Sequence, residues 1–215
     1  MRYDLHTHSL ISDGELLPAE LAARAMAIGH EALAITDHVD MTNIEEAVTM
    51  AVRAAELSED YVRLIPGVEI THVPPRQIDG LVKRARKLGA EIIVIHGETV
   101  TEPVAPGTNA VAARNPEVDI LAHPGLIIEE DVEEAARNDV TLEISGRRGH
   151  SLSNGHVARL ASSYGARMVV NSDAHAPEDL MDERRAMTVA LGAGLSEKLA
   201  SCAVNDAPAE ILRRL

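Results

Sequence analysis

Seven short apolar runs alternate along the chain with stretches of helical spacing. The runs cover residues 3–5, 33–35, 62–70, 92–95, 118–121, 140–144 and 168–170. Between them, apolar residues recur every three or four positions, as in the stretches 21–26, 44–51 and 81–88. This alternation predicts parallel strands connected by crossover helices.

Proline and glycine mark several boundaries in this pattern. Pro18 suits the first turn of a helix, and Gly89 and Gly165 suit helix ends that precede a strand. The Pro-Gly pair at 66–67 interrupts the third run, so we expect that strand to comprise only residues 67–70.

Two topologies are compatible with repeated β/α units, namely an open doubly wound sheet and a closed barrel. Ligands of an open sheet gather mainly at one switch point, whereas here nearly every run is followed by a candidate ligand. We therefore predict an α/β fold, a distorted seven-stranded (β/α)7 TIM-like barrel with its helices outside. We expect one domain over residues 1–215, because nothing in the composition shifts abruptly.

The composition excludes some functions. Phe and Trp are absent and only three Tyr residues occur, so stacking of nucleobases is poorly provided for. A net charge of -14 makes binding of long nucleic acid through a basic surface an unfavoured function. A small anionic substrate stays compatible with this charge, because divalent cations would make a pocket locally positive.

Targeting and redox signals are few. The lone Cys202 has no internal disulfide partner, and we find no apolar leader and no run as long as a membrane span. We expect a cytoplasmic protein that does not enter membranes. The oligomeric state stays open.

Nine imidazole and carboxylate side chains stand at or just beyond the ends of the apolar runs. They are His6, His8, Asp13, His38, Glu69, His96, His123, Asp173 and His175. Imidazole and carboxylate are ligands of Zn, Mn and Fe, and strand ends converge at one end of a barrel. The sequence therefore predicts a polynuclear metal site.

Two further acids stand beside the candidate histidines. Alternation along the first strand places Asp4 on the face of His6 and His8, where we expect it to orient a ligating imidazole. Asp37 precedes His38, and we expect it to orient that imidazole or to form a salt bridge elsewhere.

Each candidate also has a structural interpretation. Asp13 in a Ser-Asp-Gly sequence fits an ordinary turn, and an Arg partner would satisfy Glu69 within its apolar strand. A single histidine at a strand end could be a core residue, but repetition at successive ends favours ligands. His30 and His72 are interpreted as structural.

Substrate contacts are sought in the polar loop after the sixth run. Arg147 and Arg148 could anchor phosphate oxygens through their planar guanidinium groups, or they could form a solvated loop pair. His150 and His156 flank this loop and are candidates for contact with substrate.

Taken together, the motifs resemble the successive motifs of the PHP (polymerase and histidinol phosphatase) family. The matching segments are Asp4-Leu5-His6-Thr7-His8-Ser9, Ser12-Asp13-Gly14, Thr36-Asp37-His38, Gly67-Val68-Glu69, His96-Gly97, His123-Pro124 and Ser172-Asp173-Ala174-His175. The resemblance implies a seven-stranded distorted barrel with three divalent metal ions, Zn, Mn or Fe. It implies one ion on His6, His8, Glu69 and Asp173, a second on Glu69, His96 and His123, and a third on Asp13, His38 and His175.

The resemblance also implies phosphoester hydrolysis. We predict a metal-dependent phosphatase of a small phosphomonoester, histidinol-phosphate-like or a nucleotide, with a metal-bridging hydroxide as nucleophile. One alternative is a phosphodiesterase or exonuclease acting on nucleotide or oligonucleotide ends. Another is a noncatalytic PHP-derived subunit of an RNA-processing complex, in which a protein partner supplies the basic surface. An amidohydrolase is less favoured, because we would expect an eighth strand and another ligand order.

Overall fold

The computed structural model describes residues 2–57 and 62–215. Its parallel strands follow the order β1-β2-β4-β5-β6-β7-β8, and the short strand β3 pairs with β4 beside this path. The strands are β1 (Arg2–Thr7), β2 (His30–Ile35), β3 (His38–Val39), β4 (Arg63–Ile70), β5 (Ile92–His96), β6 (Ile120–Ala122), β7 (Thr141–Ser145) and β8 (Met168–Asn171).

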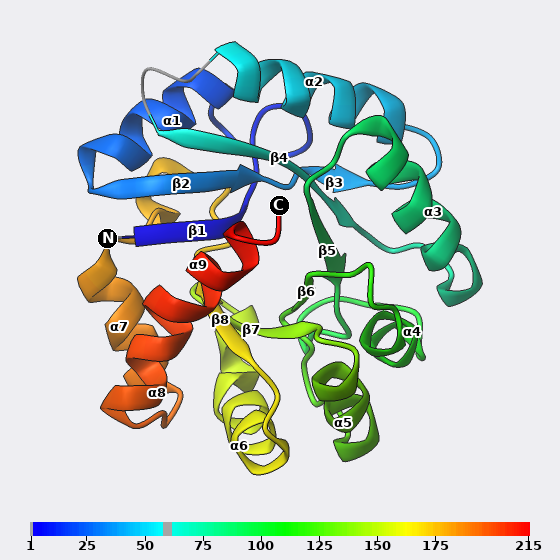
Figure 1. The fold of residues 1–215 in the computed structure, drawn as a ribbon, viewed down its shortest axis with the longest axis vertical. Helices are drawn as coiled ribbons and strands as arrows, with labels where there is room; N and C mark the ends of the chain where they lie inside the picture. Colours follow the sequence, from blue (N-terminus) through cyan, green and yellow to red (C-terminus); the bar gives the residue numbers. More distant parts are fainter. Residues whose placement is uncertain (1, 58–61) are drawn as a thin grey trace.

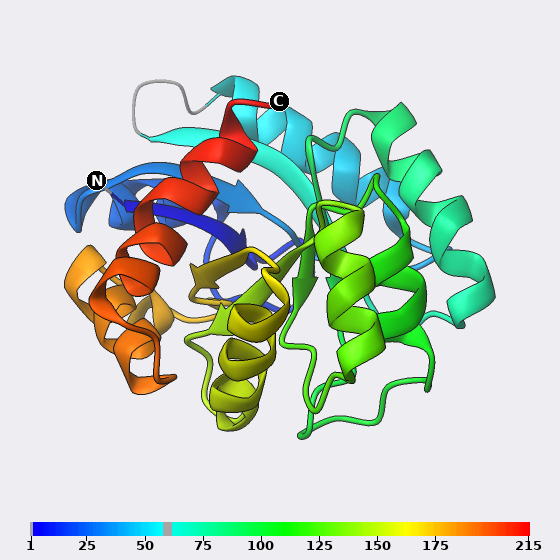
Figure 2. The same cartoon turned by 60° about the horizontal axis from the view of Figure 1, so that its bottom comes forward.

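Helices follow the strands and lie outside the sheet, except that β3 follows β2 with no helix between them (Figure 1). The α-helices are α1 (Pro18–Ala27), α2 (Ile44–Leu57), α3 (Pro75–Leu88), α4 (Thr108–Arg114), α5 (Glu129–Arg137), α6 (Asn154–Tyr164), α7 (Glu183–Gly192), α8 (Glu197–Ser201) and α9 (Ala207–Leu212). Short helical turns are η1 (His150–Ser153), η2 (Pro177–Asp179) and η3 (Cys202–Asp206). The predicted (β/α)7 TIM-like barrel is confirmed, with seven strands curving into a nearly closed ring (Figure 2).

The barrel closes between β1 and β8 through residues that follow the last strand. The backbone N–H of Asp173 donates to the carbonyl of His6 at 3.0 Å, and the N–H of His8 donates to the carbonyl of Ala174 at 2.8 Å. Lower in the same seam, the N–H of Leu5 donates to the side chain of Asn171. Residues near the candidate ligands therefore hold the two edges of the sheet together.

Two apolar layers cover the faces of the sheet. Small and β-branched side chains fill the inside of the barrel, among them Ala32, Val94 and Val169, and Ile211 of α9 packs with them. In Figure 1, α9 lies across the ring of strands and covers the end from which they start. The opposite end, where the strands finish, is left for polar side chains.

The helix and strand boundaries predicted from proline and glycine are confirmed, with one exception. Pro18 begins α1, and Gly89 and Gly165 end α3 and α6 in the left-handed conformation that glycine favours. Strand β4, however, runs through the Pro-Gly pair at 66–67, so its predicted restriction to residues 67–70 was wrong. The ring nitrogen of Pro66 cannot donate a hydrogen bond, but its carbonyl still accepts the N–H of Glu91 at 2.7 Å. The strand therefore continues through Pro66.

Among residues 2–57 and 62–215, no helix is both long and apolar enough to cross a membrane.

Candidate metal centre

All nine predicted ligands meet at the end of the barrel where the strands finish. Each belongs to a group whose nitrogen and oxygen atoms lie within 4.8 Å of one another. Four groups consist of predicted ligands alone: His8, Asp13, His38 and His175; His6, His123 and Asp173; His6, His8 and Glu69; and Glu69, His96 and His123. Sharing of His6, His8, Glu69 and His123 between groups joins the four into one cluster.

Glu69 lies at the centre of the cluster. Its Oε1 lies 3.3 Å from Nε2 of His123, and its Oε2 lies 3.5 Å from Nε2 of His6 and 3.6 Å from Nε2 of His8. The carboxylate is buried, and within the described chain neither oxygen accepts a hydrogen bond of good geometry, although Nδ1 of His38 is 2.8 Å from Oε2. A buried carboxylate of this kind needs a compensating cation.

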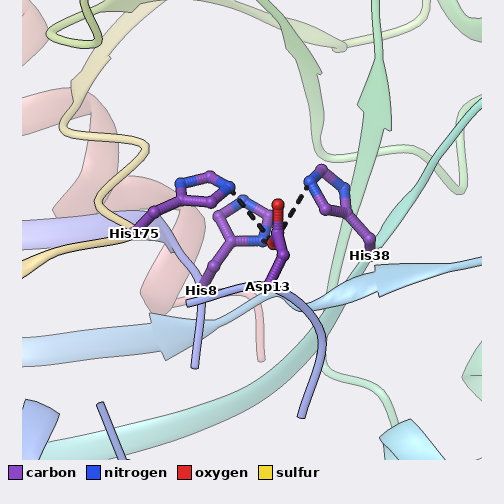
Figure 3. Close-up of side chains that lie close together, drawn as sticks. All are labelled: His8, Asp13, His38 and His175. Carbon is purple, nitrogen blue, oxygen red and sulfur yellow. Dashed lines mark ion pairs between the residues drawn. The ribbon is translucent and has the colours of Figure 1, made fainter. Parts of the chain in front are cut away.

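Asp13 joins three imidazoles at the open side of the cluster (Figure 3). Its Oδ1 lies 3.3 Å from Nε2 of His175, 3.6 Å from Nε2 of His38 and 3.9 Å from Nδ1 of His8. Partial burial works against ionisation of Asp13, but the hydrogen bond to His175 and the charge of His38 lower its pKa to about 2. Asp13 is thus an ionised ligand candidate and not merely a turn residue.

Asp37 organises the loop that carries Asp13. Its Oδ1 accepts the backbone N–H groups of Ser9 at 2.8 Å and Ser12 at 3.1 Å, and its Oδ2 accepts the Ser9 hydroxyl at 2.8 Å. The predicted contact with His38 or with a basic side chain was wrong, because serine donors of the preceding loop occupy both oxygens. Asp37 therefore acts on the site through Asp13.

Asp4 likewise acts through the backbone. Its Oδ2 pairs with Arg2 at 3.0 Å, and both oxygens accept the N–H of Ser172 at 3.1 and 3.2 Å. A register irregularity between Asp4 and Thr7 interrupts the alternation assumed in the prediction. Within the described ranges, no hydrogen bond or ion pair joins Asp4 to a predicted imidazole ligand, so this part of the prediction was wrong.

Two predicted ligands have strained backbone conformations. His123 and Asp173 have φ values of 27° and 54°, in a region that residues with side chains rarely adopt. Such conformations persist where surrounding contacts fix them, and they concentrate at functional sites.

Burial and the nearby Glu69 and Glu143 charges outweigh the charge of His6 and raise the pKa of Asp173 to about 7.

Protons and charges are unevenly distributed over the cluster. Burial lowers the pKa of His6, but the carboxylates of Glu143, Glu69 and Asp173 more than offset this and raise it well above its usual range. Burial and the charge of His38 lower the pKa of His8 well below its usual range. Divalent cations would replace the shared protons, since ligating imidazoles and carboxylates must be deprotonated.

A second observation also indicates that the candidate ligands suit divalent cations. The Nδ1 atoms of His8, His96 and His123 are buried and lack a hydrogen-bond partner in the described part of the chain. These nitrogens and the two Glu69 oxygens are buried polar atoms without partners among the described residues. The free-energy cost of burying their side chains falls if the side chains bind ions. Imidazole and carboxylate ligands suit Zn, Mn and Fe alike.

Arg147 and His150 lie at the cluster, and Arg148 does not. Nη1 of Arg147 donates to the carbonyl of Asp173 at 3.2 Å and lies 2.5 Å from Nδ1 of His175. Arg147 and His150 both line a small cavity of about 40 Å³ together with the candidate ligands. Arg148 is exposed and lines neither this cavity nor the larger one beside it, which fits the solvated interpretation.

The other histidines divide differently from the prediction. His30 hydrogen-bonds the carbonyl of Ala25 and is structural, as expected. His156 hydrogen-bonds the carbonyl of Ile127 at 2.7 Å and lines neither cavity, so its contact with substrate stays a prediction. His72, interpreted as structural, lies with its ring 4.8 Å from that of His96 and lines the larger cavity.

Glu102 and Glu143 are site residues that the sequence reasoning missed. Oε2 of Glu102 lies 3.1 Å from Nε2 of His96, and this contact leads the interactions that lower the Glu102 pKa to about 2. Glu143 is fully buried, with Oε1 2.8 Å from Nδ1 of His6. Glu102 stands in a loop without any apolar pattern, whereas Glu143 interrupts an apolar run as Glu69 does and could have been found.

A barrel that gathers imidazoles and carboxylates where its strands end defines a class of barrel proteins with candidate metal centres. Within that class, the PHP domain model matches residues 4–119, which is more than half of the chain. The chain belongs to the PHP family, and the family predicted from the motifs is confirmed. This family includes metal-dependent phosphoesterases.

Several known proteins are similar to this chain. An uncharacterized protein of Methanocaldococcus jannaschii is 48% identical over 100% of both chains. Ribonuclease P protein component 3 of Methanosarcina barkeri is 27% identical, covering 99% of this chain and 89% of its own. A chain in the structure of archaeal Ribonuclease P with mature tRNA has the same fold, with a TM-score of 0.70 and 16% identity over 99% of this chain and 89% of that one.

Proposed function

We propose that the chain is a metal-dependent phosphoesterase that hydrolyses a small phosphomonoester. The observation that carries this proposal is the meeting of eight further candidate ligands with the buried Glu69 carboxylate, whose oxygens lack hydrogen-bond partners in the described chain. Three divalent ions, Zn, Mn or Fe, would be held as the family resemblance implies: one by His6, His8, Glu69 and Asp173, a second by Glu69, His96 and His123, and a third by Asp13, His38 and His175. Such ions supply activated water and positive charge around a phosphoryl group.

Several residues of the chain would help to hold the ions and the substrate. Glu69 belongs to two ligand groups and would be shared between two ions. Arg147 and His150 border the small cavity, where a guanidinium and an imidazole can donate hydrogen bonds to phosphate oxygens. The strained backbone at His123 and Asp173 aims two ligands into the same space.

The residues that line the larger cavity favour a substrate with a small leaving group. It has a volume of about 580 Å³ and shares Asp13, His38 and Glu102 with the small cavity. Among the described residues that line it, Asp40 adds another acid, and neither Lys nor Arg occurs. A polynucleotide would bring further phosphates to this surface without a basic partner, whereas a compact leaving group would not.

A second candidate function rests on the relatives. The similarity to Ribonuclease P protein component 3 covers nearly the whole chain, so a noncatalytic role in an RNA-processing complex is the alternative proposal. The complete set of nine donors favours catalysis, because a purely structural subunit has no need of them. The net charge of -14 also favours a small substrate unless a partner supplies the basic surface.

A substrate panel tests the proposal. Full-length protein supplied with Mn²⁺ or Zn²⁺ is incubated with phosphomonoesters, phosphodiesters and short RNA, and inorganic phosphate and cleaved products are measured. We expect release of phosphate from monoesters that stops with a chelator and returns with metal. Turnover of diesters alone would support the nuclease alternative, and absence of turnover with all three would support the noncatalytic one.

Arg147→Ala is expected to lower kcat/KM for the best monoester roughly 10- to 100-fold, because a charge-assisted hydrogen bond contributes about 1.5–3 kcal/mol. Arg148→Ala is the matched control, since Arg148 is the exposed neighbour that lines neither cavity. Steady-state kinetics of both variants decide the point. Equal loss in the two variants would contradict the assignment of Arg147 to the phosphate pocket.

A further inference from the structure

Strand β7 provides no predicted ligand, yet its central residue lies inside the donor cluster. Glu143 is fully buried and makes three contacts with the cluster and the seam. Its Oε1 lies 2.8 Å from Nδ1 of His6 and accepts Nδ2 of Asn171 at 3.0 Å. Its Oε2 accepts the backbone N–H of His123 at 3.1 Å.

We propose that Glu143 is a positioning residue that sets two candidate ligands at once, the imidazole of His6 and the backbone of His123. This inference rests on the metal centre of the proposed function. His6 lies on β1 and His123 follows β6, so a single carboxylate on β7 connects ligands from distant parts of the chain. His6 and His123 share one ligand group with Asp173. Each also belongs to a second group, His6 with His8 and Glu69, and His123 with Glu69 and His96.

The contact with His6 fixes which ring nitrogen faces the cluster. A carboxylate beside Nδ1 favours a proton on that nitrogen, which leaves the lone pair on Nε2. Nε2 of His6 is the atom that lies 3.5 Å from Glu69 and 3.7 Å from Asp173. Glu143 thus directs Nε2 of His6 toward the space that it shares with Glu69 and Asp173.

The contact with His123 acts on a strained backbone. His123 has a φ of 27°, and a conformation of this kind persists only where neighbouring contacts offset its strain. The hydrogen bond from its N–H to Glu143 is such a contact. It helps to keep Nε2 of His123 at 3.3 Å from Oε1 of Glu69.

Asn171 connects this carboxylate to the seam of the barrel. Its Nδ2 donates to Glu143, and its Oδ1 accepts the N–H of Leu5 at 3.0 Å. The position of Glu143 is therefore set by the same side chain that helps to join β8 to β1. A carboxylate fixed in this way can orient a ligand without approaching the substrate.

Glu143→Gln is the informative variant, because it keeps the size of the side chain and removes one acceptor. The carboxylate accepts from His6 and Asn171 on one oxygen and from His123 on the other. In Gln, whichever way the amide is turned, its NH2 group faces at least one of these donors. Asp119→Asn is the matched control, since Asp119 also accepts a backbone N–H, from Ile93 at 2.7 Å, at the opposite end of the barrel.

The test is a calorimetric titration of the chelator-treated full chain with Mn²⁺. We expect the ions to bind about 10- to 100-fold more weakly to Glu143→Gln, the usual effect of removing a residue that orients a ligand, and within about 3-fold of wild type to Asp119→Asn. Wild-type affinity in Glu143→Gln, or equal losses in both variants, would overturn the inference. A wild type that binds neither Mn²⁺ nor, in the same titration, Zn²⁺ would instead overturn the proposed function.

A spectroscopic measurement on the wild type keeps the inference testable if Glu143→Gln does not fold. In the Zn²⁺-loaded protein, the imidazole nitrogen spectrum should show His6 with its proton on Nδ1, the signal being assigned by its loss in His6→Gln. A proton on Nε2 would overturn the inference whatever the behaviour of the variant. A structural role for Glu143 in packing alone would not set this tautomer.

Discussion

Glu69→Gln is expected to lower phosphomonoester turnover by at least about 100-fold, beyond the 10- to 100-fold loss typical of residues that only orient a ligand. Glu69 belongs to two ligand groups, one with His6 and His8 and one with His96 and His123. The amide is uncharged and would leave two positions with weaker binding at once. Elemental analysis of the purified variant should show fewer bound ions, alongside the loss in kcat.

The control for this variant is Glu91→Gln. Glu91 is also a glutamate beside a strand, but it is exposed, lies near the start of β5 and, among residues 2–57 and 62–215, has only Arg63 at 4.0 Å as an ionic partner. We expect wild-type turnover and ion content from it. Glu69→Gln with full ion content and turnover would contradict the central place of Glu69 and, with it, the metal centre.

The predicted ligands could be found because their signals are local. His96 and His123 directly follow short apolar runs, and in the structure they occupy the last position of β5 and the position just after β6. Parallel strands bring their ends to one side of a barrel, so order along the chain translates into proximity without knowledge of any particular contact. The PHP motifs add the grouping of the ligands but no information on how each one is held.

The supporting residues could be predicted less well because their partners are distant in sequence. Asp4 contacts Ser172, and Asp37 contacts Ser9 and Ser12, none of which the alternation of a single strand can identify. The irregular register after Asp4 also breaks that alternation. Glu143 is different, because an acid inside an apolar run requires a buried partner, and this local signal was available.

The course of β4 shows a further limit of local rules. Proline usually marks the end of a central strand because it lacks a backbone donor. At Pro66 the strand passes from pairing with β2 to pairing with β5, and Gly67 allows the close approach of Ile92, whose carbonyl would lie 2.9 Å from an added Cβ. Tertiary pairing on both sides outweighs the local preference.

Asp4→Ala is expected to reduce the free energy of unfolding by about 3–5 kcal/mol, because it removes the carboxylate with which the buried guanidinium of Arg2 pairs. Both side chains are almost completely buried, and Arg2 also donates to the carbonyl of Val170 at 2.9 Å across the seam. The loss should appear as a lower midpoint of urea unfolding with an unchanged slope.

A solvent-exposed ion pair is the control for this prediction. Removing Glu20, which pairs with Arg24 on α1 with both side chains 48% exposed, should change stability by less than about 1 kcal/mol. If Asp4→Ala changed stability as little, the seam would not depend on the Arg2–Asp4 pair.

The Arg2–Asp4 pair lies where β1 and β8 lack a continuous ladder, and Asp4 also accepts the N–H of Ser172 directly before Asp173. Its loss should therefore weaken ion binding as well as stability, because the contact that closes the barrel also holds the backbone of a candidate ligand.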